Sequence, residues 1–193
     1  MTGPDNLDQR MTDAGIPPRF RSARVADLTG PLEAFARCHL HDKAREGVGV
    51  WLFGAYGCGK THALAAFAAH LLQAGLRVEW ADWFWLFRAL RSLGDYGATA
   101  AQALQVSRTA PILFLDDFGK PGDVQRETAL LFEIVNHRYN HRLPTFFSCN
   151  AGPDQLFGPG RGNPDPAGAI WDRFGECVEA VGMKETSRRR AAA

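Results

Sequence analysis

Gly54-Ala-Tyr-Gly-Cys-Gly-Lys-Thr61 decides the fold, because it fits G-x-x-x-x-G-K-[ST], the pattern of a phosphate-binding loop. In this pattern the glycines let backbone N–H groups turn towards phosphates. Lys60 reaches the β- and γ-phosphates, and the Thr61 hydroxyl ligates Mg²⁺. A helix that begins at the lysine adds the positive end of its dipole. We therefore expect the nucleotide, ATP, to be held by Gly54, Gly57, Cys58, Gly59, Lys60, Thr61 and His62.

The residues on either side of this loop have the expected patterns. The short apolar run 48–53 is typical of a buried parallel strand, and residues 60–73 have the apolar spacing of a helix. A glycine-rich turn without a ligand is the alternative, and these flanks disfavour it.

Further from the loop, apolar runs and helical spacing alternate. The predicted strands are 76–80, 111–115, 144–149 and 177–181. The predicted helices are 31–45, 83–93, 124–142 and 168–175, and the less regular segment 94–109 could be another helix. Residues 1–30 are expected to be an irregular arm and 151–168 a loop. The alternation predicts an α/β fold with a mainly parallel sheet, that of a P-loop NTPase.

Polar side chains follow two of the predicted strands. Asp116, directly after strand 111–115, is placed to hold Mg²⁺ through its water, and Asp117 to polarise an attacking water as general base. Asn150 follows strand 144–149, where it could orient that water or contact the γ-phosphate. A solvated turn is the alternative for each of these segments. The phosphate-binding loop favours the catalytic interpretation for the two acids.

Composition limits the class of protein. The chain has 193 residues, of which 46% are hydrophobic and 22% charged, and this suits one globular domain. It contains no apolar run of 18 residues and no apolar signal-peptide segment, so we expect no membrane association. Its four scattered cysteines suggest free thiols in the cytoplasm. Since the net charge is only +1, a DNA contact would have to come from a local patch.

Six patterns together resemble the DnaC/IstB-like group of AAA+ ATPases, which includes helicase loaders and transposition helper ATPases. They cover residues 14–182 and stand in the order found in that group. They are Ala14-Gly-Ile-Pro-Pro-Arg-Phe20, Gly57-Cys-Gly-Lys-Thr-His62, Leu115-Asp-Asp-Phe-Gly119, Asn136-His-Arg-Tyr-Asn140 before Leu143-Pro-Thr145, Ser148-Cys-Asn150 and Ile170-Trp-Asp-Arg173.

The resemblance implies an AAA+ core with a five-stranded parallel sheet. It implies that the arm around Ile16, Pro17 and Phe20 lies against the adenine. It also implies that Asn150 is the first sensor and that Arg173 is an arginine finger for a neighbouring subunit. A surface ion pair of Arg173 with Asp172 or Glu176 is the alternative. On this basis we divide the chain into an arm (1–30), an ATPase core (31–182) and a basic tail (183–193).

Two basic helix faces are candidates for other contacts. Phe84, Arg88 and Arg91 share the side of helix 83–93 opposite its apolar stripe, which suits single-stranded DNA through base stacking and phosphate contacts. The resemblance supports this assignment, and a buried Phe84 beside solvated arginines is the equally weighted alternative. The second face, at the end of helix 124–142, comprises His137, Arg138, His141 and Arg142. We interpret it as cations that match the helix dipole.

The sequence therefore predicts an AAA+ protein that binds and hydrolyses ATP with Mg²⁺. It would contact single-stranded DNA and assemble with itself through the Arg173 face. Its partner would be a replicative helicase or a transposase, which places it in DNA replication or transposition. One alternative is an assembly adaptor that binds nucleotide with negligible turnover and does not touch DNA. A small-molecule kinase is disfavoured, because segment 151–168 supplies only Arg161 where a kinase lid would need several arginines.

Overall fold

Five parallel strands form one sheet in the order β2-β3-β4-β1-β5. The computed structural model describes residues 4–91, 97–118, 124–157 and 167–183. The strands are β1 (Gly49–Gly54), β2 (Glu79–Asp82), β3 (Leu113–Phe118), β4 (Thr145–Cys149) and β5 (Val178–Met183). Since all of them are parallel, their carboxyl ends lie along one edge of the sheet. The P-loop NTPase fold predicted from the alternating pattern is confirmed.

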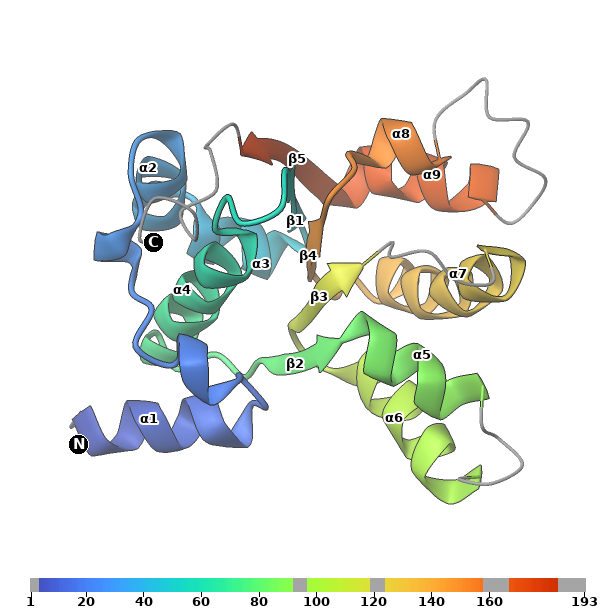
Figure 1. Ribbon diagram of the computed structural model, residues 1–193, viewed down its shortest axis with the longest axis horizontal. Coiled ribbons are helices and arrows are strands. Elements are labelled where there is room, and N and C mark those ends of the chain that lie inside the picture. The colour runs from blue at the N-terminus through green and yellow to red at the C-terminus, as the bar shows by residue number, and fades with distance from the viewer. Residues whose placement is uncertain (1–3, 92–96, 119–123, 158–166, 184–193) are drawn as a thin grey trace.

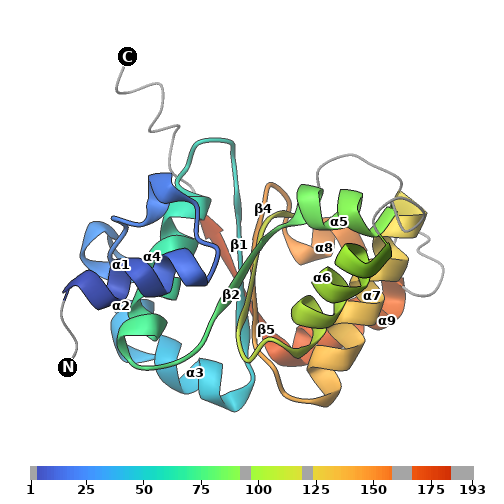
Figure 2. The same ribbon diagram turned by 90° about the horizontal axis from the view of Figure 1, so that it is seen from below.

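Helices cover both faces of the sheet (Figures 1 and 2). One face carries α1 (Pro4–Asp13), α2 (Pro31–Cys38), α3 (Leu40–Glu46) and α4 (Lys60–Gln73). The other carries α5 (Trp83–Arg91), α6 (Gly97–Thr109), α7 (Val124–Asn140), α8 (Pro153–Phe157) and α9 (Ala167–Cys177). Two short 3₁₀ turns, Pro18–Phe20 and Val25–Asp27, connect α1 to α2. Both sheet faces are therefore buried, as is usual for parallel strands.

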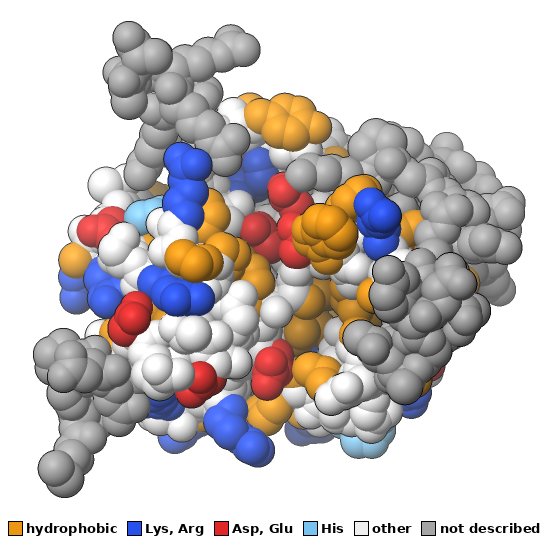
Figure 3. All heavy atoms as spheres, turned by 60° about the horizontal axis from the view of Figure 1, so that its bottom comes forward, with side chains coloured by type: hydrophobic (Ala, Val, Ile, Leu, Met, Phe, Trp, Pro, Cys, Tyr) orange, Lys and Arg blue, Asp and Glu red, His pale blue; other side chains and the backbone are white. Residues whose placement is uncertain are grey.

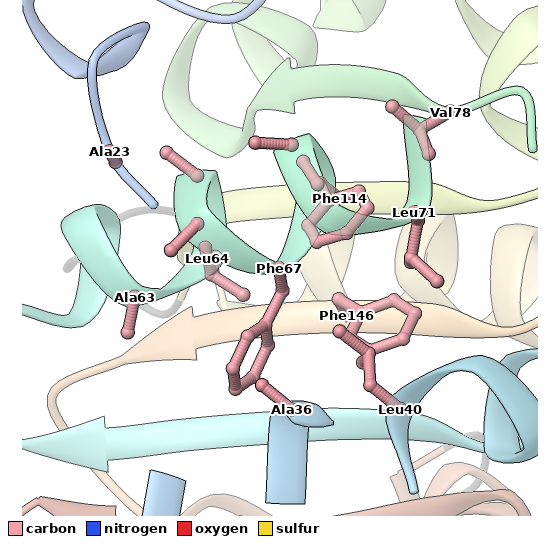
Figure 4. Close-up of a cluster of buried hydrophobic side chains, with 14 of the residues drawn as sticks. Ala23, Ala36, Leu40, Ala63, Leu64, Phe67, Leu71, Val78, Phe114 and Phe146 are labelled. Atoms are coloured by element: carbon pink, nitrogen blue, oxygen red, sulfur yellow. The ribbon is translucent and has the colours of Figure 1, made fainter. Parts of the chain in front are cut away.

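A hydrophobic cluster on the α4 side places the nucleotide loop. Leu64 and Phe67 of α4 lie fully buried over the stacked rings of Phe114 from β3 and Phe146 from β4 (Figure 4). The two ring centroids are 4.7 Å apart. Because α4 is packed so closely on the sheet, its first turn is held rigidly at the carboxyl edge.

The prediction that residues 1–30 form an irregular arm is wrong for their secondary structure. Leu7, Met11 and Ala14 are spaced as one apolar stripe of a helix, and Met11 and Ala14 are buried against the α4 side of the core. The segment after α1 also covers the free edge of β2, because the Trp80 N–H donates to the Ala14 carbonyl at 2.8 Å. The division into arm, core and tail stays a prediction, and residues 184–193 of the tail lie outside the described ranges.

Several predicted boundaries differ from the observed ones. The predicted helix 31–45 is divided at His39, and the predicted strand 76–80 becomes β2 at Glu79–Asp82. That strand begins where a partner is present, since the Glu79 N–H donates to the Ile112 carbonyl at 2.9 Å. The predicted loop 151–168 contains the short helix α8 and the start of α9.

Arg138, interpreted from the sequence as a cation that matches the helix dipole, is a buried residue. Its side chain is 1% exposed and lies where α6 and α7 meet the amino ends of β3 and β4. Burial lowers the pKa of Arg138 to about 9, so the guanidinium is still charged at neutral pH. It donates to Thr145 Oγ1 at 2.8 Å and to the carbonyls of Ala110 at 2.8 Å, Pro144 at 2.7 Å, Ser107 at 3.1 Å and Arg108 at 3.3 Å. Arg138 is thus a buried link between segments that are distant in the sequence.

Candidate nucleotide-binding site

The phosphate-binding loop joins the end of β1 to the start of α4. Gly59 precedes α4 with φ of +100°, a left-handed conformation that side chains other than glycine rarely adopt. Gly54 lies against β5, where a Cβ atom would stand 2.3 Å from the Met183 carbonyl oxygen. The loop can therefore turn tightly and present backbone N–H groups at the N-terminus of a 14-residue helix.

Lys60 is buried in this loop, with 7% of the residue exposed. Its ammonium donates to the Gly54 carbonyl at 2.9 Å, to the Ala55 carbonyl at 3.0 Å and to Asn150 Oδ1 at 3.0 Å. These three oxygens are acceptors of the kind that phosphate oxygens can replace. The last contact joins Lys60 to Asn150, which follows β4 and is 90 residues away in the sequence.

Thr61 and Asp116 form the pair expected of a magnesium site. The Thr61 hydroxyl donates to Asp116 Oδ1 at 3.1 Å, and the Ser148 hydroxyl donates to the same oxygen. Burial raises the pKa of Asp116, and the hydrogen bonds from Ser148 and Thr61 oppose that rise. A hydroxyl beside a desolvated carboxylate supplies the hard oxygen ligands that Mg²⁺ prefers, so the residues present fit this ion.

Asp117 is turned towards the nucleotide side by an irregularity in β3. The register between β3 and β4 shifts between Leu115 and Phe118, and Asp117 has φ of +58°. Its N–H donates to Ser148 Oγ at 2.9 Å, which stabilises this unusual backbone. Such a bulge re-aims a side chain, and the Asp117 side chain accordingly lines the cavity while Asp116 is buried.

A cavity of about 280 Å³ is lined by most of the predicted site residues. Its lining consists of Arg19, Phe20, Tyr56, Gly57, Gly59, Lys60, Thr61, His62, Asp117 and Asn150. The predicted adenine contacts are separated, because Phe20 lines the cavity whereas Ile16 is fully buried in the core. Cys58 is buried behind the loop, with its Sγ 3.9 Å from Lys60 Nζ.

Three residues near the site were not identified as candidates from the sequence. Arg19 adds a cation to the cavity, Tyr56 is 71% exposed at its mouth, and Ser148 connects the two acids. All three stand inside the quoted patterns, so position within a motif was the available signal. The described residues contain no group of three or more histidine, cysteine or acidic side chains placed to hold a metal ion.

Arg173 does not line this cavity. It lies between α7 and α9, where it contacts Asn136 and the rings of Phe132 and Tyr139. The alternative of an ion pair with Asp172 or Glu176 does not describe its position, and Glu176 instead accepts a hydrogen bond from the Tyr139 hydroxyl. Within the described ranges, Arg173 takes part in no ion pair.

The outer side of α5 carries an exposed aromatic surface. Phe84 is 47% exposed and Trp85 is 64% exposed, and the Arg88 guanidinium lies 5.8 Å and 5.4 Å from their ring centroids. Trp85 was not a candidate from the sequence, whereas the side chain of the candidate Arg91 lies outside what the structure describes. Figure 3 shows hydrophobic, basic and acidic side chains close together on this face of the molecule. We call Phe84, Trp85 and Arg88 the α5 surface.

The α5 surface and the nucleotide cavity belong to the same edge of the sheet. The Trp85 N–H donates to Asp82 Oδ1 at 3.0 Å, so Asp82 caps the helix at the end of β2. Asp82 pairs in register with Asp116 of β3.

No helix in the described part of the chain is long and apolar enough to cross a membrane.

Two curated relatives are similar to part of this chain. The replicative helicase loader DnaI of Bacillus subtilis (strain 168) is 33% identical over 120 residues, which cover 60% of this chain and 37% of that protein. The insertion sequence ATP-binding protein y4iQ/y4nD/y4sD of Sinorhizobium fredii (strain NBRC 101917 / NGR234) is 32% identical over 157 residues, which cover 77% and 49%. The chain therefore spans half or less of the length of these relatives.

Solved structures of other proteins share the fold. The crystal structure of DnaI has a TM-score of 0.72 at 23% identity and covers 90% of this chain and 94% of that one. The replication initiator DnaA bound to AMPPCP and single-stranded DNA has a TM-score of 0.69 at 19% identity, covering 89% and 51%. At these identities the likeness shows the P-loop AAA+ fold.

The family profile described as "IstB-like ATP binding protein" matches residues 21–192, which include every lining residue of the cavity except Arg19 and Phe20. The DnaC/IstB-like AAA+ resemblance drawn from the six patterns is thereby confirmed. With the phosphate-binding loop, the sheet order and this match in agreement, the chain belongs to the IstB-like family of ATP-binding proteins.

Proposed function

We propose that this protein binds ATP with Mg²⁺ and hydrolyses it in an assembly of several copies. One observation carries the proposal: a single cavity is lined by Lys60, Asp117 and Asn150, and the Thr61–Asp116 pair stands beside it. A structural loop would not need a cation, a buried carboxylate and a turned-out acid to converge at one helix N-terminus.

Each side chain has a role that follows from its position. Lys60 would exchange its carbonyl partners for phosphate oxygens, and Thr61 and Asp116 would hold Mg²⁺, which would neutralise phosphate charge. Asp117 would accept a proton from the attacking water, and Asn150 would orient that water. Phe20 would pack against the base, and Arg173 would serve the cavity of a neighbouring copy.

Turnover and its dependence on a neighbouring copy can be tested together by steady-state phosphate release. We expect Arg173→Ala and Asp117→Asn each to lose more than about tenfold in turnover when assayed alone. Mixed in equal amounts, they should regain turnover, because Asp117→Asn copies supply an intact Arg173 to Arg173→Ala copies that have a complete cavity. The matched control Asp172→Asn alters an exposed acid next to the finger and should behave like the parent.

Two results would contradict this proposal. If the mixture were no faster than the separate variants, Arg173 would not act between copies. If the parent bound ATP tightly without turnover in the presence of Mg²⁺ and single-stranded DNA, the protein would be a nucleotide-binding assembly adaptor.

We further propose that the protein acts on DNA in the cytoplasm, together with a replicative helicase or a transposase. The relatives that are named a helicase loader and an insertion sequence ATP-binding protein support these two settings. The α5 surface supports contact with single-stranded DNA, since exposed rings stack on bases and an arginine neutralises phosphate. Its position beside the cavity would let ATP and DNA influence each other.

Trp85→Ala should weaken binding to a fluorescent single-stranded oligonucleotide by roughly five- to a hundredfold, because it removes one stacking ring. Arg88→Glu should weaken binding and also flatten the slope of log affinity against log salt by about 1 or more. Arg37→Glu is the matched control, because Arg37 lies on α2, on the opposite face of the sheet. Equal affinity and equal salt slope in all four proteins would exclude the α5 surface as a DNA contact.

A further inference from the structure

Arg173 is fixed by several contacts, although it lies on the outer layer of helices. Its Nε–H donates to Asn136 Oδ1 at 3.1 Å, and its Nη1 donates to the Ala169 carbonyl at 2.8 Å. The guanidinium carbon stands 5.3 Å from the ring centroid of Phe132 and 5.5 Å from that of Tyr139. A long side chain at a surface position usually samples many rotamers, and these four contacts restrict it to one direction.

The contacts from α7 come from one stripe of that helix. Phe132, Asn136 and Tyr139 are spaced i, i+4 and i+7, so they share the face that packs on α9. In Figure 1 the two helices lie next to each other at the same end of the molecule. Arg173 of α9 therefore lies across a row of two rings and one amide.

Tyr139 is itself held in place from α9. Its hydroxyl donates to Glu176 Oε2 at 2.5 Å, three residues beyond Arg173. Glu176 is consequently engaged with the tyrosine, and the partners that touch the arginine are an amide, a backbone carbonyl and two rings. These partners orient the guanidinium without neutralising its charge, whereas a carboxylate would form an ion pair with it.

The pattern of donors indicates which end of the side chain is available. The contacts described above engage Nε and Nη1 of the guanidinium. A guanidinium has five N–H donors in one plane, and the two on Nη2 are not used by these contacts. An arginine gripped in this way can still donate to a phosphate through Nη2.

We propose that Phe132, Asn136, Tyr139 and Glu176 are positioning residues for Arg173, which they hold ready to reach the γ-phosphate of ATP bound by a second copy of this chain. This inference rests on the proposed action of Arg173 between copies. The α7 of the same copy arranges Arg173 before assembly, so the neighbouring copy does not have to order it. Loss of the row should then lower the rate of the chemical step without changing how tightly a cavity binds ATP.

The test replaces the amide by an isosteric apolar side chain. Asn136→Leu should lower kcat by about ten- to a hundredfold and leave the KM for ATP within about twofold of the parent, because Asn136 does not line the cavity of its own copy. Phe132→Leu should lower kcat in the same direction and guards against a folding defect peculiar to one variant. Asn140→Leu, at the exposed end of the same helix, is the matched control and should have the parent kcat.

Mixing distinguishes a misplaced finger from general damage. Copies carrying Lys60→Ala have a defective cavity and an intact row, so they should restore turnover to Asn136→Leu copies. The positioning role is overturned if Asn136→Leu has the parent kcat while Arg173→Ala does not, or if Lys60→Ala copies fail to restore turnover. If Arg173→Ala itself has the parent kcat, the proposed action between copies fails as well.

Discussion

Asp116→Asn is expected to reduce ATP turnover by about a hundred- to a thousandfold while making the protein more stable at neutral pH. The loss follows because an amide cannot supply the negative charge that holds Mg²⁺ beside the Thr61 hydroxyl. The gain follows because burial raises the pKa of Asp116, so its ionised form is less favourable in the folded protein than in the unfolded chain. The amide oxygen can still accept the hydrogen bonds of Thr61 and Ser148.

The stability difference between the D116N variant and the parent should depend on pH. A carboxyl whose folded pKa is raised destabilises the fold increasingly as the pH rises from its ordinary value of 3.8 through the raised value. The advantage of the D116N variant should therefore be present at pH 7 and vanish as the pH falls below that window. Thermal unfolding from pH 4 to pH 8 measures it.

Asp117→Asn is the matched control for this experiment. Asp117 is half-exposed and lines the cavity, so its replacement should lower turnover without raising the melting temperature. A D116N variant that melts below the parent at pH 7 would show that the ionised carboxylate is needed for the fold, and not for chemistry alone.

Arg138→Met is expected to lower the free energy of unfolding by about 3–5 kcal/mol. Methionine can occupy much of the same volume, but it donates no hydrogen bonds. The Thr145 hydroxyl and the carbonyls of Ala110 and Pro144 would then lose a buried donor. For a protein of this size the loss corresponds to a fall of roughly 6–20 °C in melting temperature.

The control for Arg138→Met is Arg37→Met on α2. Arg37 is exposed and forms an i,i+4 ion pair with Glu33, an interaction worth about 0.3–0.5 kcal/mol. Differential scanning calorimetry should show a shift of about 1–2 °C for this variant. Equal shifts for Arg138→Met and Arg37→Met would contradict the assignment of Arg138 as a buried link.

The parts of the site that could be predicted are those set by local sequence. Lys60 and Thr61 stand inside one short motif, and Asp116 and Asn150 end apolar strands whose parallel arrangement brings them to one edge. In a parallel sheet, residues at the carboxyl ends of different strands lie at the same edge, so their positions in the sequence predict that they are close in space. The fold class follows from the same alternation of strands and helices.

The features that could not be predicted depend on partners distant in the sequence. Arg138 sits near a helix end, like many solvated cations, and its acceptors come from α6 and from the starts of β3 and β4. Helix α5 has aromatic residues on several sides, so its spacing alone does not show that Trp85 is exposed. The contact of Arg173 with α7 likewise depends on how two helices pack, which periodicity does not specify.

The backbone hydrogen bond between Trp80 and Ala14 also bears on aggregation. β2 ends one side of the sheet, and an uncovered terminal strand offers a template on which the strand of another molecule can add. Here the chain covers that template with its own segment just after α1. A shortened version that begins after residue 16 would keep the whole phosphate-binding loop and lose this cover. Shortened versions prepared for crystallography should therefore retain α1, even though the nucleotide cavity is built without it.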